Sequence, residues 1–189
     1  MKNLRFSTAH FLPALLVLVA LLARLTPGTR TIDDAYITFR YARNLLAGAG
    51  PVFNPGEAVL GTTTPLYMGL MAGLGALSGG VDAPFPLLAV LVNALADAIT
   101  ALLLLQFGTR LGSARAGAAA GLVWAIAPYS VTFAIGGLET SVYVLLLTAC
   151  AYAAFTRRRN LAAGLAALAL LTRPDALILL GPLALERLA

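Results

Sequence analysis

Long runs of alanine, leucine and valine alternate with short polar connections along this chain of 189 residues. Five apolar stretches approach the roughly 20 residues that a helix needs to cross a bilayer. These stretches cover residues 7–26, 84–107, 116–135, 138–156 and 160–187. The pattern therefore predicts an all-α, polytopic transmembrane helical protein that forms a single transmembrane module.

A sixth apolar stretch, residues 66–78, is shorter and is interrupted by glycines. As a helix it would cover only about 20 Å, because each residue adds about 1.5 Å. The hydrocarbon core of a bilayer is about 30 Å thick. We therefore expect a re-entrant or interfacial helix here, within an outer loop of residues 27–83 that carries amphipathic juxtamembrane helices.

Charged residues divide between alternate connections, which indicates sidedness. The basic sets are Lys2 and Arg5, then Arg110 and Arg115, then Arg157, Arg158 and Arg159; the acids of the other connections are Asp33, Asp34, Glu57, Asp82 and Glu139. The positive-inside rule places the three basic sets in the cytoplasm. This predicts a multi-pass protein of the cell (inner or plasma) membrane, with a cytoplasmic N-terminus and its polar loops outside.

Composition supports a membrane protein and excludes two other classes. The chain is 60% hydrophobic and 11% charged, whereas soluble domains carry about 25% charged residues. Its net charge of +5 does not indicate nucleic-acid binding, because the basic residues are scattered over connections and form no stripe. The single cysteine, Cys150, excludes a disulfide framework.

Arg24 interrupts the place where a signal-peptide cleavage site would lie, so we expect the first helix to be retained.

Three features inside the apolar stretches predict contacts. Gly117-x-x-x-Gly121 is typical of close helix packing, and Pro128 predicts a kink. Asn93 and Asp97 are four residues apart, so they share one helix face. An acid within the membrane is a candidate functional residue; alternatively, Asp97 is a structural residue tied to neighbouring helices through Asn93.

Two adjacent acids, Asp33 and Asp34, open the polar segment after the first stretch. Thr31-x-x-Asp34 resembles a capping box, and acids in a first turn favour the helix dipole. Capping explains one acid and does not require both. The spacing leaves catalysis and capping open.

The residues after these acids predict an amphipathic helix on the membrane surface. One stripe of the predicted helix contains Ile37, Tyr41 and Leu45, and another contains Tyr36, Arg40 and Arg43. Gly48, Gly50 and Pro51 then end the helix.

Two later polar features accompany this segment. Glu139 lies in the short connection GGLET, where it is either a first-turn acid or a functional residue. Arg173 and Asp175 flank Pro174 inside the last apolar stretch. Burying an unpartnered arginine in a membrane costs at least about 2.5 kcal/mol. Arg173 therefore either pairs with Asp175 or faces a cavity that holds an anionic group, and the helix-breaking proline favours the cavity.

Five segments, DDAYITFRYARNL, PVFNPGE, GTTTPL, GGLET and LLTRPDAL, together resemble the polytopic GT-C glycosyltransferases. The resemblance covers residues 30–180. It is strongest for the branch with arabinofuranosyltransferases of actinobacterial cell walls, and more distant for lipid A aminoarabinose transferases and protein O-mannosyltransferases. It implies that Asp33 is the catalytic acid with Asp34 beside it, that Glu139 is a second outer-loop acid, and that Arg173 contacts a lipid phosphate. Members of the family usually have about twice as many spans, so the chain is expected to be an N-terminal module or a truncated product.

The predicted function is that of a membrane glycosyltransferase acting on the extracytoplasmic face, in cell-envelope or cell-wall biogenesis. Its expected partners are a polyprenyl-phosphate-linked sugar donor, a glycan, lipid or protein acceptor, and membrane lipids, with no nucleic acid. Asp33 would act as the general base, and Arg173, or secondly Arg40, would stabilise the leaving phosphate. Asp34 and Glu139 would orient hydroxyl groups.

The spacing of acids, histidine and cysteine predicts no transition-metal site. No cofactor is identified with certainty, and metal dependence stays open because the acidic pair could hold a divalent cation. The alternative from another class is a non-catalytic transport or assembly subunit with a path along Asp97 and Arg173. A third hypothesis is an inactive truncated fragment of such an enzyme.

Overall fold

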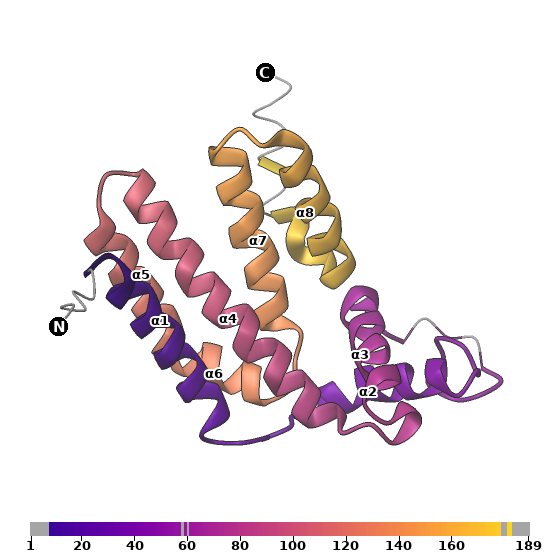
Figure 1. Ribbon diagram of the computed structural model, residues 1–189. Coiled ribbons are helices and arrows are strands. Elements are labelled where there is room, and N and C mark those ends of the chain that lie inside the picture. Colours follow the sequence, from indigo (N-terminus) through magenta and orange to yellow (C-terminus); the bar gives the residue numbers. More distant parts are fainter. Residues whose placement is uncertain (1–7, 58, 60, 179–180, 183–189) are drawn as a thin grey trace.

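The computed structural model describes residues 8–57, 59, 61–178 and 181–182, and it contains helices and no strand within them (Figure 1). This confirms the all-α class. In chain order the elements are α1 (Thr8–Leu25), α2 (Asp33–Leu46), α3 (Pro65–Leu77), the 3-10 helix η1 (Gly80–Asp82), α4 (Phe85–Arg110), α5 (Ala114–Ile126), α6 (Pro128–Ile135), α7 (Thr140–Phe155), α8 (Arg159–Thr172) and the 3-10 helix η2 (Pro174–Ala176).

Among the described residues, one helix, α4, is long and apolar enough to cross a membrane. A second span results if α5 and α6 are counted together, and α1, α3, α7 and α8 are apolar but shorter. Apart from α2, which lies in the polar segment after the first stretch, the α-helices coincide largely with the six apolar stretches of the sequence. A multi-pass topology remains a prediction. Lys2, Arg5 and the end of the stretch 160–187 lie outside the described residues.

The bundle is built around α4, which packs against α1, α5 and α7, while α8 packs against α7 (Figure 1). Glycine makes the α4–α5 contact close. A Cβ atom on Gly117 would lie 2.7 Å from the carbonyl oxygen of Leu105, and one on Gly121 would lie 2.8 Å from that of Ala101. Such distances are too short for any side chain, so the prediction of close packing at these glycines is confirmed.

Pro128 separates α5 from α6, and the two helix axes differ by 48°. Proline lacks the N–H that would continue the helical ladder and fits the first turn of a new helix. The predicted kink is confirmed. The bend turns α6 beneath the end of the bundle, so the connection from α6 to α7 runs towards α2 (Figure 1).

A buried ion pair joins α1 to α4 at the centre of the bundle. Arg24 Nε donates to Asp97 Oδ2 at 2.8 Å, and neither side chain is exposed. Asp97 also accepts hydrogen bonds from Trp124 Nε1 at 3.1 Å and from Ser141 Oγ at 3.0 Å. Asn93 instead donates to the carbonyl of Ala134 in α6 and to that of Leu138 in the α6–α7 connection. The alternative of a buried Asp97 tied to neighbouring helices is therefore confirmed, but its partners are Arg24, Trp124 and Ser141 and not Asn93.

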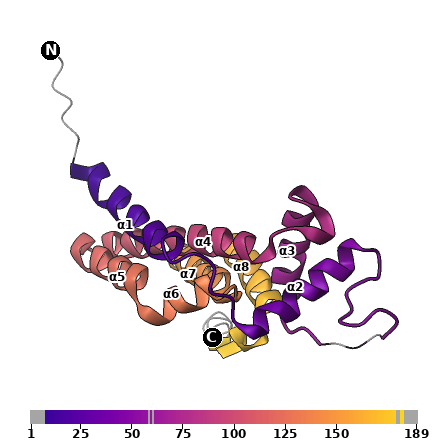
Figure 2. The ribbon, with the colours of Figure 1, turned by 90° about the horizontal axis from the view of Figure 1, so that it is seen from below.

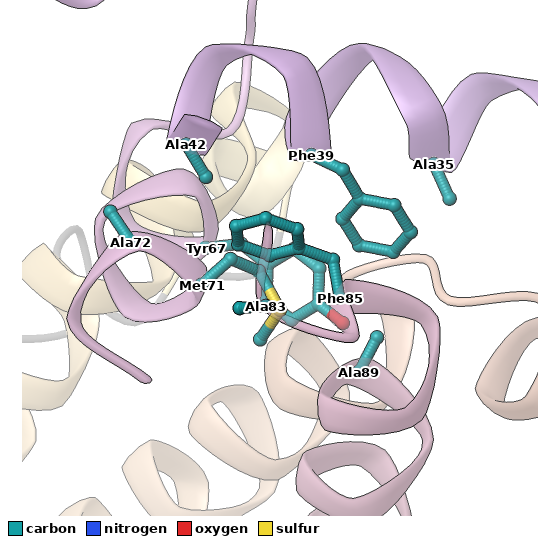
Figure 3. Close-up of a cluster of buried hydrophobic side chains, with 9 residues drawn as sticks. All are labelled: Ala35, Phe39, Ala42, Tyr67, Met71, Ala72, Ala83, Phe85 and Ala89. Atoms are coloured by element: carbon teal, nitrogen blue, oxygen red, sulfur yellow. The ribbon is translucent and has the colours of Figure 1, made fainter. Parts of the chain in front are cut away.

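Helices α2 and α3 form a lobe to one side of the bundle (Figure 2). Their shared core includes Phe39 of α2, Tyr67 and Met71 of α3, and Phe85 at the start of α4 (Figure 3). The rings of Phe39 and Phe85 are stacked with centroids 5.9 Å apart. This cluster anchors the lobe to the bundle and fixes the direction of α2.

The bundle separates the connections at its two ends. The arginine-bearing connections from α4 to α5 and from α7 to α8 lie at one end (Figure 1). The starts of α2 and α7, which carry Asp33, Asp34 and Glu139, lie at the opposite end. The polar segments identified in the sequence are thus neighbours in space.

Candidate functional site

A polar cavity of about 370 Å³, here called the acidic cavity, lies between α2, the segment 61–64, the α6–α7 connection and the end of α8. It brings together three charged side chains that are far apart in sequence: Asp34, Glu139 and Arg173. Three of the residues that the sequence predicted for substrate binding therefore line one space.

An extended segment before α2 sets the position of this helix. The backbone N–H of Arg30 donates to the carbonyl of Ile135 at 3.0 Å, and that of Ile32 donates to the carbonyl of Gly136 at 2.9 Å. A Cβ atom on Gly136 would come within 2.6 Å of the Ile32 side chain. Gly137 follows with a φ of +83°, a left-handed conformation that favours glycine. The glycine pair of GGLET thus allows the start of α2 to lie beside Glu139.

The two adjacent acids take different positions. Asp33 and Asp34 are the first two residues of α2, and both are exposed. Asp34 lines the acidic cavity, whereas Asp33 is not among its lining residues. The residue before the helix is Ile32, and no side chain caps the helix start, so the predicted capping box at Thr31 is wrong. Both acids still lie in the first turn, where the helix dipole favours negative charge.

Arg173 lies at the break that Pro174 creates. Helix α8 ends at Thr172, Arg173 has an extended backbone with φ of −153° and ψ of 130°, and a 3-10 turn follows. Its Nε donates to Asp175 Oδ1 at 3.1 Å, and its Nη1 lies 3.4 Å from Glu139 Oε1. The side chain is 41% exposed. Arg173 therefore both pairs with Asp175 and lines a cavity, two arrangements that were alternatives in the sequence-based prediction.

Four threonine hydroxyls line the acidic cavity. Thr38 of α2 and Thr64 lie with their Oγ1 atoms 3.4 Å apart, and Thr62 Oγ1 lies 3.2 Å from Thr64 Oγ1. Thr63 also lines the cavity. The run GTTTPL carries part of the family resemblance, but none of these threonines was predicted as a site residue.

Residues behind the cavity hold Glu139 in place. Asn93 Nδ2 donates to the carbonyls of Leu138 at 2.9 Å and Ala134 at 3.1 Å. The hydroxyl of Tyr67 lies 3.3 Å from the carbonyl of Gly137 and 3.5 Å from Asn93 Oδ1. Burial raises the pKa of Tyr67 far above its usual value; the hydrogen bond to Asn93 lowers it, and the charge of Glu139 raises it further. Tyr67 thus remains a neutral donor.

Arg40 does not reach the acidic cavity. It lines a different cavity with Tyr36 and Arg43, so the stripe of Tyr36, Arg40 and Arg43 lies on one face of α2 as predicted. Ile37 and Tyr41, from the other predicted stripe, line a third cavity.

The acidic cavity has the chemistry of a site for a hydroxyl-rich ligand. Two carboxylates and several threonine hydroxyls can accept hydrogen bonds, and one guanidinium can donate them. Among the residues that the structure describes, no group of three or more His, Cys, Asp or Glu side chains could hold a metal ion. Asp34 and Glu139 are the two carboxylates of the cavity that could bind a divalent cation.

Comparison with known proteins gives one relative. The chain is similar to the terminal beta-(1->2)-arabinofuranosyltransferase of Mycobacterium tuberculosis (strain ATCC 25618 / H37Rv), with 34% identity over 123 residues. The match covers 61% of this chain and 19% of that enzyme, so the chain spans about a fifth of the relative's length. Neither a protein-family model nor a solved structure matches the chain. The chain is thus related in sequence to a glycosyltransferase.

Proposed function

We propose that this chain carries the catalytic site of a membrane glycosyltransferase, which transfers a sugar from a polyprenyl-phosphate-linked donor to an acceptor hydroxyl. One observation carries the proposal: Asp34, Glu139 and Arg173 come from three distant segments and line a single polar cavity. The relationship to an arabinofuranosyltransferase supports a sugar as the transferred group. Within a GT-C enzyme, this chain would be the part that contains the first outer loop.

The proposed reaction is a displacement at the anomeric carbon of the donor sugar. The oxygen of the acceptor hydroxyl forms a bond to this carbon, while the bond from the carbon to the donor phosphate oxygen breaks. The lipid phosphate leaves with the electron pair, and the acceptor proton passes to a carboxylate. A positioned carboxylate accelerates such a step because the hydroxyl is a weak nucleophile until its proton is removed.

The cavity lining supports Asp34 as the proton acceptor, although the family resemblance implies Asp33. Asp34 and Arg173 both line the cavity, whereas Asp33, the preceding residue of α2, is not among the lining residues. Glu139 would orient a sugar hydroxyl while its other contact fixes Arg173. Arg173 would donate hydrogen bonds to the departing phosphate. Asp34 and Glu139 could also hold a divalent cation that would stabilise the departing phosphate. Loss of transfer activity on addition of a chelator would test this.

A span candidate supports this assignment, since a polyprenyl donor is confined to a bilayer. Helix α4 is long and apolar enough to be a span by length and composition. The acidic cavity is lined by residues at the starts of α2 and α7, and these starts lie at the end of the bundle opposite the arginine-bearing connections (Figure 1). By the positive-inside rule the cavity would then face the outer surface.

The test compares Asp33→Asn with Asp34→Asn in membranes that contain the full chain. The donor is a radiolabelled polyprenyl-phosphoryl arabinofuranose, and the acceptor is an arabinofuranose-terminated oligosaccharide. We expect Asp34→Asn to lower transfer by at least about 100-fold, the usual contribution of a general base, and Asp33→Asn to act much less. Loss of activity only in Asp33→Asn would instead assign the base to Asp33. No transfer by the correctly inserted parent chain would contradict the proposal that this chain carries the catalytic site.

A further inference from the structure

A second cavity, of about 490 Å³, lies on another face of α2, and it shares no lining residue with the acidic cavity. We call it the arginine cavity. From α2 it is lined by Tyr36, Arg40 and Arg43, and from the entry to α4 by Phe85 and Pro86. The proposed transfer reaction uses none of these residues.

Arg40 is held at one wall by neutral oxygen atoms. Its Nε donates to the carbonyl of Phe53 at 2.8 Å, and its Nη2 donates to Asn54 Oδ1 at 3.1 Å. The guanidinium also lies over the ring of Phe53, 4.4 Å from the ring centroid. These contacts fix the position of the charge without neutralising it.

Arg43 is held in the same manner one turn further along α2. Its Nε donates to the carbonyl of Val81 at 2.9 Å, and its guanidinium lies 6.0 Å from the ring centroid of Phe85. A guanidinium has five N–H donors. Arg40 uses two of them and Arg43 uses one in hydrogen bonds within the described part of the chain.

Neither arginine has a carboxylate partner. The ion pairs among the described residues involve Arg24 and Arg173, and no acid lines the arginine cavity. Glu57 accepts a hydrogen bond from Asn54 rather than from Arg40. Arg173, by contrast, is bound to both Glu139 and Asp175. Within the described part of the chain, the arginine cavity thus has two arginines in its lining that pair with no carboxylate.

The rest of the lining of this cavity is mostly apolar: Phe39, Pro55, Ala83, Phe85 and Pro86, with Asn44 as a polar member. The rings of Phe39 and Phe85 are stacked, with Phe39 on α2 facing the start of α4 (Figure 3). Helix α4, the span candidate, begins at Phe85. A ligand that places an anion between the arginines would therefore have apolar surface beside it, next to the helix that would enter the bilayer.

We propose that the arginine cavity binds the phosphate headgroup of an anionic membrane lipid. Two guanidiniums match the charge and hydrogen-bond geometry of a phosphate monoester. The aromatic and proline side chains contact the glycerol and first methylenes of the lipid. Binding there anchors the lobe of α2 and α3 at the membrane surface. The inference does not depend on the proposed transferase function, because no residue is shared between the two cavities.

The test is native mass spectrometry of the full chain released from detergent micelles. Dihexanoyl phosphatidic acid is the probe, dihexanoyl phosphatidylcholine is the neutral comparison, and inorganic phosphate is the soluble arm. The variant is Arg40→Gln with Arg43→Gln. Arg30→Gln removes one positive charge, half the change of the double variant, from an exposed arginine outside the cavity and serves as the control for an arginine charge elsewhere on the chain. Thermal unfolding shows whether each variant remains folded. Arg43→Lys, which retains the positive charge, replaces the double variant in the test if that variant does not fold.

The parent chain and Arg30→Gln should bind phosphatidic acid in preference to phosphatidylcholine. The double variant should bind phosphatidic acid at least about tenfold more weakly, the effect of losing one charge-assisted contact or more. Arg43→Lys should keep part of the preference, and added salt should weaken it. Equal binding of both lipids by the parent, or an unchanged preference in the folded double variant, would overturn the proposal. Displacement of phosphatidic acid by an equal concentration of inorganic phosphate would overturn the assignment to a lipid.

Discussion

Arg24 of α1 and Asp97 of α4 form a buried ion pair with Nε and Oδ2 at 2.8 Å, although 73 positions separate them in the chain. Arg24 also donates to the carbonyl of Ala125 and to Ser130 Oγ. Asp97 accepts from Trp124 and Ser141 as well. The pair thus connects five helices, α1, α4, α5, α6 and α7. With its oxygens occupied, Asp97 is a structural residue, and this arrangement gives no support to a transport path along it.

The pair predicts a large loss of stability when one partner is removed. Arg24→Met should lower the free energy of unfolding by about 3–5 kcal/mol, because it leaves a buried carboxylate without its cation. Arg24→Met combined with Asp97→Leu should recover much of this loss, since no buried charge then remains. Thermal unfolding in detergent micelles measures both, with Arg30→Gln as an exposed control. Purely additive losses in the double variant would contradict the coupling.

Arg173 should not tolerate lysine in the transfer reaction. A guanidinium can hold two oxygens of one phosphate while it keeps its contacts with Glu139 and Asp175, and an ammonium group cannot. Arg173→Lys should lower transfer by roughly tenfold or more, with expression and membrane insertion unchanged. Arg159→Lys, an exposed position at the start of α8, is the matched control. Full transfer activity of Arg173→Lys would remove this residue from the proposed mechanism.

Gly117 should resist even the smallest substitution. A Cβ atom there would lie 2.7 Å from the Leu105 carbonyl and 2.8 Å from the Leu104 carbonyl, and these backbone atoms cannot rotate away. Gly117→Ala should therefore destabilise the α4–α5 contact by about 1–3 kcal/mol, the usual cost of overpacking. Gly164→Ala, in the interior of α8 with no atom near its added Cβ, should be neutral or stabilising by up to about 1 kcal/mol. Thermal unfolding compares the stability of the two variants. Equal stability would show that α4 and α5 can move apart to accommodate the added Cβ atom.

Sidedness can be tested with single cysteines in a Cys150→Ser background. A membrane-impermeant maleimide should label Thr62→Cys in intact cells, whereas Asn160→Cys should react only after permeabilisation. Leu111→Cys, an exposed position after α4, should behave like Asn160→Cys. Labelling of Leu111→Cys from outside would show that residues 66–78 cross the membrane and that the expected topology is wrong.

Local patterns were sufficient to predict the helices. Apolar runs of helical length predicted every helix of the bundle, proline marked the bend at Pro128, and the glycine pair Gly117 and Gly121 indicated close packing. The stripe of Tyr36, Arg40 and Arg43 also lies on one helix face. Each of these properties depends on neighbours within one or two turns, which the sequence displays directly.

The partners of the polar side chains depended on the tertiary structure. Arg24 belongs to an apolar stretch and its partner lies on a different helix, so no local spacing could indicate the pair. Of the two adjacent acids, Asp34 lines the cavity and Asp33 does not, because of the direction in which α2 runs. This direction depends on the backbone hydrogen bonds of Arg30 and Ile32 with Ile135 and Gly136. The bend at Pro128 and the close approach at Gly136 place Glu139 beside Arg173. The sequence alone shows which residues form helices and which are charged. Asp34, Glu139 and Arg173 converge on one cavity through packing between segments that are distant in sequence, and such contacts depend on the three-dimensional arrangement of the whole bundle.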